Sequence, residues 1–115
     1  MSKTEVIIKG IEKNSLNVIY AGRHWTKRKK DKDKCKLIVR SQFKKWFSKQ
    51  NQYKVSYTFF FKTKPLDASN TVYMLKMIED VIFESDGYNV VTEIKIKSKK
   101  ATEDYVKITV KELKK

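Results

Sequence analysis

The sequence predicts one mixed α/β (α+β) domain: a small mixed β-sheet with two main helices, in the order β-α-β-α-β-β. Two observations favour this fold class. Residues 53–62 alternate between apolar and polar side chains, and two other segments repeat apolar residues at three- and four-residue steps. The chain has only three Gly and one Pro, which argues against a linker-rich or disordered chain. Its 115 residues match one domain with a modest core, so we expect residues 1–115 to form a single domain.

The strands are predicted from short apolar or alternating runs. The first covers residues 5–9. The strongest signal comes from the second, which places Tyr53, Val55, Tyr57, Phe59 and Phe61 on one side. Residues 90–97 and 105–110 follow as two closing strands, which we expect to form a hairpin. Residues 16–25 are aromatic and polar without clear periodicity, which is typical of an ordered loop.

Two helices are predicted from apolar residues that recur on one face. The first helix follows the basic segment 26–34 and runs to about Ser48, with a shared apolar face of Cys35, Ile38, Val39, Phe43, Trp46 and Phe47. We therefore expect Trp46 in the core. The second helix covers residues 70–84, capped by Asp67 or Ser69, with Val72, Leu75, Ile78 and Ile82 facing the core.

The charge of the chain predicts a polyanionic partner. It carries 27 Lys and Arg against 13 Asp and Glu, and twelve of these cations fall between Arg23 and Lys49. A solvated helix face is the alternative, but so large an excess favours phosphate binding. Lys outnumbers Arg, which suits the nucleic-acid backbone better than base edges. The candidate DNA contacts are Arg23, His24, Lys27, Arg28, Lys29, Lys30 and Lys34.

Other motifs limit the function classes. The lone Cys35 cannot form an internal disulfide and is expected as a buried helix residue, and no Cys/His cluster has zinc-ligand spacing. The lone His24 is expected to be structural or to contact phosphate, and Trp25 can stack on an unpaired base. No signal peptide or membrane-length segment is present, so we expect a cytoplasmic protein with no membrane partner.

A group of acids stands out against this basic background. Asp67, Glu79, Asp80, Glu84 and Asp86 lie in one short stretch, although carboxylates weaken attraction to phosphate. A divalent metal at a phosphodiester is one explanation, because Mg²⁺ takes carboxylate, water and phosphate oxygens. Asp67 and Asp86 flank the second helix, Asp80 lies one turn from Lys76, and Lys76 can stabilise the developing charge. The alternative is that these acids are surface or capping residues.

Several motifs resemble one protein family. The segments Tyr20-Ala-Gly-Arg-His-Trp25 and Lys27-Arg-Lys-Lys-Asp31, together with Asp67-Ala-Ser-Asn70, Lys76-Met-Ile-Glu-Asp80 and Asp86, are similar to those of phage-borne RusA-like Holliday-junction resolvases. The resemblance implies a homodimeric endonuclease that needs Mg²⁺ or Mn²⁺ and makes paired symmetric nicks in four-way DNA junctions, in DNA recombination and repair. It implies a metal held by Asp67 and Asp86 with help from Asp80, Lys76 as a catalytic residue, and a bacterial host.

The chain departs from the family pattern at two positions. Ser69 stands at the second position of the family's Asp-x-Asp motif, and Ser85 at the first position of its Asp-Asp pair. Each change removes one charged ligand. Two alternatives follow: a structure-specific DNA-binding protein that has lost cleavage, and a small basic RNA-binding protein, which would prefer RNA to DNA junctions at matched salt.

Overall fold

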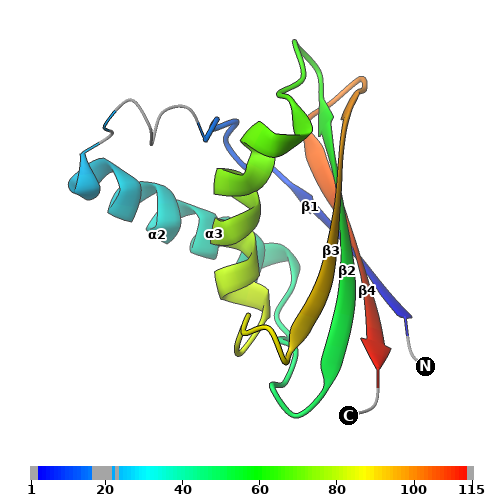
Figure 1. The fold of residues 1–115 in the computed structure, drawn as a ribbon. Coiled ribbons are helices and arrows are strands. Elements are labelled where there is room, and N and C mark those ends of the chain that lie inside the picture. The colour runs from blue at the N-terminus through cyan, green and yellow to red at the C-terminus, as the bar shows by residue number, and fades with distance from the viewer. Residues whose placement is uncertain (1–2, 17–21, 23, 114–115) are drawn as a thin grey trace.

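The structure, a computed structural model, describes residues 3–16, 22 and 24–113 and confirms the predicted fold class (Figure 1). A four-stranded mixed sheet carries two main helices on one side. The elements in chain order are β1 (Lys3–Lys9), α2 (Trp25–Gln42), β2 (Gln52–Phe61), the 3-10 turn η1 (Ala68–Thr71), α3 (Val72–Ile82), β3 (Val91–Lys100) and β4 (Tyr105–Leu113). No helix in this part of the chain is long and apolar enough to cross a membrane.

The sheet order is β1-β4-β2-β3, which corrects the predicted C-terminal hairpin. β2 lies between β3 and β4, parallel to the first and antiparallel to the second. The connection between β3 and β4 is also bonded to the end of β2. The backbone N–H of Ala101 donates to the carbonyl of Phe61 at 2.9 Å. The N–H of Lys62 likewise donates to Oδ1 of Asp104 at 2.7 Å. The most apolar strand therefore takes a central place, where both of its edges are paired.

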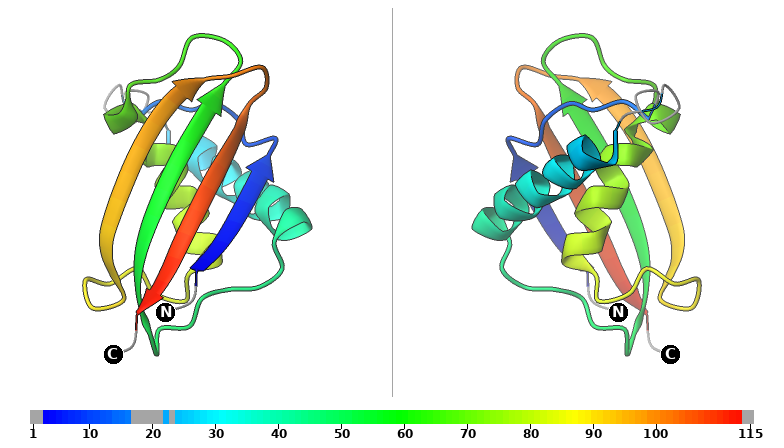
Figure 2. Two further views of the ribbon diagram at one scale, coloured as in Figure 1. Left: turned by 90° about the vertical axis from the view of Figure 1, so that its right-hand side faces the viewer. Right: turned by 90° about the vertical axis from the view of Figure 1, so that its left-hand side faces the viewer.

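The core lies between the sheet and the two helices, which cover the same face (Figure 2). The predicted alternation of β2 is confirmed, since its five inward side chains from Tyr53 to Phe61 are at most 2% exposed. Leu75, Ile78 and Ile82 of α3 pack against them, as predicted. Val72 is only half-buried and lies at the rim of the core. Cys35 is a buried free thiol in α2, also as predicted.

The bounds of α2 differ from the prediction. It begins at Trp25, where the Nδ1 of His24 accepts a 3.1 Å hydrogen bond from the backbone N–H of Thr26 and caps the helix. It ends at Gln42, because Phe43 is extended and the Arg40 guanidinium binds the carbonyls of Phe43, Lys45 and Val81. The segment 43–48 is therefore not helical. Trp46 is 55% exposed, so its predicted place in the core is wrong.

The start of α3 also differs in detail from the prediction. Neither Asp67 nor Ser69 caps it through a side chain, because the turn η1 precedes it and Thr71 takes the capping position without a side-chain cap. The backbone N–H of Asn70 donates instead to the carbonyl of Asp67 at 2.8 Å. The hydroxyl of buried Thr71 bonds the carbonyl of Ala68 at 2.6 Å. Asp67 keeps an exposed carboxylate, free of the capping role.

Candidate functional site

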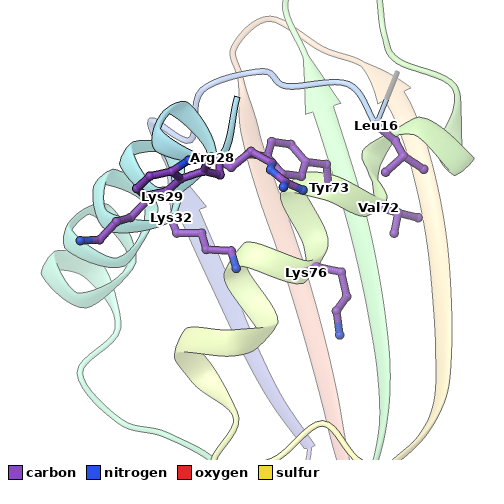
Figure 3. A pocket seen from close by; sticks show the side chains of 8 residues that line it. Leu16, Arg28, Lys29, Lys32, Val72, Tyr73 and Lys76 are labelled. Carbon is purple, nitrogen blue, oxygen red and sulfur yellow. The ribbon is translucent and has the colours of Figure 1, made fainter. Parts of the chain in front are cut away.

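A cleft with basic walls lies between the N-terminal half of α2 and the start of α3 (Figure 3). Its volume is about 480 Å³. The lining side chains are Leu16 from the loop, Trp25, Arg28, Lys29 and Lys32 from α2, and Val72, Tyr73 and Lys76 from α3. The four α2 residues follow the i, i+3, i+4, i+7 spacing of one helix face. Four cations and an exposed indole therefore surround one apolar hollow.

A buried hydrogen bond joins the two helices beneath this cleft. The Tyr73 hydroxyl donates to Oδ2 of Asp31 at 2.7 Å, and both residues are buried. The Nζ of Lys27 lies 3.8 Å from Oδ1 of the same carboxylate. A buried carboxylate needs such partners, because losing its hydration is costly. Asp31 thus holds the basic face of α2 against α3.

Only some of the predicted DNA-binding residues line the cleft. Arg28 and Lys29 line the cleft, and Arg28 extends from α2 towards Tyr73 in Figure 3. Lys27 pairs with Asp31, and Lys34 pairs with Glu12 at 3.2 Å. Lys30 is exposed on α2, His24 caps that helix, and Arg23 lies outside the described residues.

Lys32 is a cleft residue that the sequence prediction missed. It lies seven residues after Trp25 and four after Arg28. Helical spacing would therefore have placed Lys32 on the same face of α2 as these two residues. Lys76, predicted as a catalytic residue, also lines the cleft, from the opposite helix.

A small cluster of charged groups adjoins the cleft through Lys76. Its ammonium donates to Oε1 of Glu79 at 3.1 Å and to Oδ2 of Asp86. The hydrogen bond from Lys76 lowers the pKa of Asp86, and the pair raises the pKa of Lys76. Two carboxylates, one on α3 and one in the loop after it, thus share one ammonium.

Glu79 is the second residue that the sequence prediction left without a role. Its carboxyl is 2% exposed, and burial raises its pKa even though Lys76 opposes that shift. Among the described residues, its Oε2 atom has no hydrogen-bond partner, and neither does the buried hydroxyl of Tyr57. Burial and the charge of Glu79 raise the pKa of Tyr57 well above its ordinary range. The sequence signal for its burial was its spacing, because Glu79 lies four residues after Leu75 and so shares the apolar face of α3.

The three predicted metal ligands do not gather. Asp67 is exposed before η1, and exposed Asp80 lies with Lys36 and Arg40 in a separate hollow between α2 and α3. Asp86 instead shares Lys76 with Glu79. Within the described ranges, no three His, Cys, Asp or Glu side chains are placed to hold a metal ion together. Binding of Mg²⁺ or Mn²⁺ stays a prediction, for which Glu79 and Asp86 are the better-placed carboxylates.

The cleft between α2 and α3 can therefore hold an anion, and the carboxylates of Glu79 and Asp86 lie next to it, joined through the Lys76 ammonium. No protein-family model and no curated protein matches the chain. The resemblance to RusA-like resolvases therefore rests on the sequence motifs alone and stays a prediction.

Proposed function

We propose that the protein binds the backbone of branched DNA through the cleft between α2 and α3. One observation carries this proposal: Arg28, Lys29, Lys32 and Lys76 surround a single hollow that also exposes Trp25. Each cation that neutralises a phosphate releases a condensed counterion, which is the main source of affinity for nucleic acids. Mostly lysine walls suit recognition of backbone and shape rather than base sequence.

The apolar part of the cleft favours a branched rather than a regular duplex. Trp25 is 65% exposed, and Leu16 and Val72 provide further apolar surface. An aromatic side chain in a basic groove is a platform for an unpaired base, and such stacking is tolerant of sequence. Branch points offer bases that leave the helical stack easily. We propose that the binding protein is a homodimer, because a two-fold symmetric junction matches an isologous pair of subunits. We place this activity in the cytoplasm.

Binding assays at matched salt test this proposal. We would compare a four-way DNA junction, a linear duplex and an RNA of equal length. The proteins are wild type, the cleft variant Arg28→Gln/Lys29→Gln/Lys32→Gln and the control Lys44→Gln/Lys45→Gln/Lys64→Gln. All three control residues are exposed and none lines the cleft. The cleft variant should lose about tenfold or more in junction affinity and about 2–3 in the salt slope. Equal losses in the control, or a preference for RNA, would overturn the proposal.

A second candidate function is metal-dependent nicking of the bound DNA, and it is favoured by the place of Lys76. This residue lines the cleft and also contacts Glu79 and Asp86, so the carboxylates adjoin the proposed phosphate position. Oε2 of Glu79, which has no hydrogen-bond partner in the part of the chain that the structure describes, and the carboxylate of Asp86 fit Mg²⁺ or Mn²⁺, which needs only one or two carboxylates beside waters and phosphate. When bound, the ion would polarise the phosphoryl oxygen and supply a water of lowered pKa. Lys76 offsets one of the two negative charges of the carboxylates and, because it also lines the cleft, lies where it can contact the phosphate.

A nicking assay on a labelled four-way junction tests this candidate. Wild type is compared with Glu79→Gln, Asp86→Asn and Asp67→Asn in Mg²⁺ or Mn²⁺, with melting curves to confirm folding. We expect symmetric nicks from wild type and Asp67→Asn, and binding without cutting from the other two. Cutting that depends on Asp67 but not on Glu79 would restore the carboxylate set predicted from the sequence. Binding without cutting in either metal would leave a structure-specific DNA-binding protein.

A further inference from the structure

The face of the sheet that points away from the helices is open and strongly basic. No helix covers it in the left view of Figure 2. The outward residues of the four strands, here called the open face, are Lys3, Glu5, Ile7 and Lys9 of β1, Lys107, Thr109, Lys111 and Tyr105 of β4, Lys54, Ser56, Thr58 and Phe60 of β2, and Glu93, Lys95, Lys97 and Lys99 of β3. The open face thus carries eight lysines and only two glutamates.

The strand register places three of these lysines directly opposite one another. Lys3 of β1 pairs with Lys111 of β4, and Lys111 pairs with Lys54 of β2. We call these three residues the lysine row. The next position along the row is Glu93 of β3, which lies 4.0 Å from Lys54. Among the described residues, neither Lys3 nor Lys111 has a carboxylate within ion-pair distance.

Such a row is costly for the isolated protein. Like charges directly opposite on neighbouring strands destabilise a sheet, because their side chains start about 5 Å apart. Lysines often protect edge strands from pairing with other chains, but this explanation fails here. Lys111 and Lys54 lie on β4 and β2, the two central strands, whose edges are already paired. A bound polyanion would turn the repulsion into attraction.

The open face is also hollowed at the lysine row. A depression of about 290 Å³ is lined by Lys3, Lys54, Lys95, Lys111, Glu93, Val55, Ser56 and Thr109. Ser56 and Thr109 are paired across β2 and β4, one step from the row. Their short side chains leave room between the lysines, and their hydroxyls can donate to phosphate oxygens.

We propose that the open face binds the phosphate backbone of a second duplex arm of the same DNA, with the lysine row as its centre. The proposal rests on the proposed DNA binding and extends it to a second surface. Because α2 and α3 cover the other face of the sheet, one protein would contact two arms from opposite sides (Figure 2). DNA is favoured over a second copy of the chain, since two copies of so basic a face would repel each other.

Charge removal on each surface tests this inference. The open-face variant is Lys3→Gln/Lys54→Gln/Lys111→Gln, compared with wild type, the cleft variant and the Lys44/Lys45/Lys64 control on a four-way junction between about 50 and 200 mM salt. We expect the open-face variant to lose about tenfold or more in affinity. Its salt slope should fall by about 0.9 for each lost phosphate contact, whereas the control changes little.

The outcomes separate this inference from the proposed function. If the open-face variant matches the control while the cleft variant loses affinity, the second surface is overturned and the cleft stands. If only the open-face variant loses affinity, the cleft is overturned and the second surface stands. The melting temperature of the open-face variant at low salt should equal or exceed that of wild type, because repulsion is removed. A marked fall in melting temperature would make the lysine row structural and overturn the inference.

Discussion

The Tyr73 hydroxyl donates a 2.7 Å hydrogen bond to Oδ2 of Asp31, a residue 42 positions earlier in the chain. This buried bond joins α2 to α3 directly beneath the basic cleft. Asp31 is one of the two acids in the basic stretch between Arg23 and Lys49, and its side chain is buried, while Arg28 and Lys32 of the same helix line the cleft. The bond therefore couples the stability of the fold to the geometry of the proposed binding surface.

Replacing Tyr73 by Phe should destabilise the protein. The variant removes the hydroxyl and leaves the buried Asp31 carboxylate with one hydrogen bond fewer. A hydrogen bond to a charged group contributes about 1.5–3 kcal/mol, so we expect a loss of this size in the free energy of unfolding, measured by urea denaturation. Tyr88→Phe is the matched control, because Tyr88 is 91% exposed. Equal stabilities of the two variants would contradict a structural role for the bond.

Glu79 and Asp86 should change stability with pH in opposite directions. The pKa of Glu79 is raised above its ordinary 4.5, so its stabilising contribution is present below about that pH and is lost as the pH rises through the folded value. The pKa of Asp86 is lowered below 3.8, so its contribution is present above that pH and is lost as the pH falls.

Urea denaturation between about pH 3 and pH 8 measures both effects. Relative to wild type, Glu79→Gln should become more stable as the pH rises from about 4.5. Asp86→Asn should be less stable than wild type at neutral pH, and this difference should shrink in acid. Parallel pH profiles for the two variants would show that the two carboxylates do not differ in environment as described.

Replacing Trp25 by Ala should weaken binding to DNA that contains unpaired bases. Base stacking on an aromatic side chain contributes about 1–3 kcal/mol, so a junction or gapped duplex should lose roughly five- to hundredfold in affinity. A fully paired duplex should lose much less. Trp46→Ala is the control, because Trp46 is also exposed but does not line the cleft. Fluorescence anisotropy with each DNA measures the difference, and equal losses from the two tryptophans would argue against stacking in the cleft.

Cys35 should react very slowly with thiol reagents while the protein is folded. It is 4% exposed, and burial raises the pKa of its thiol from 9.0 to about 11, so little reactive thiolate forms at neutral pH. Labelling followed by absorbance should be slow in buffer and fast in denaturing urea. Rapid labelling of the folded protein would show that α2 opens readily from the sheet.

The sequence predicted elements best where their pattern was strong and local. The alternation in β2 identified its buried face, and the helical spacing of Leu75, Ile78 and Ile82 identified the core side of α3. Predictions failed where distant contacts decide the outcome. Arg40 binds a carbonyl at the end of α3, so α2 ends before Trp46. β2 pairs with β3 and with β4 along its length and so separates them, although these two strands are neighbours along the chain.

The candidate site likewise has features that follow from the sequence and features that only the tertiary structure decides. The sequence by itself determined the net charge, the basic run in α2 and the helical spacing that puts Arg28, Lys29 and Lys32 on one face. Only the tertiary structure brought Lys76 of α3 to that face, joined Glu79 to Asp86 through its ammonium, and aligned Lys3, Lys111 and Lys54 across three strands. The physical reason is that spacing along one element fixes which side chains share its face. Which charges meet depends on how the elements pack and on strand register, and buried contacts far apart in the chain set both.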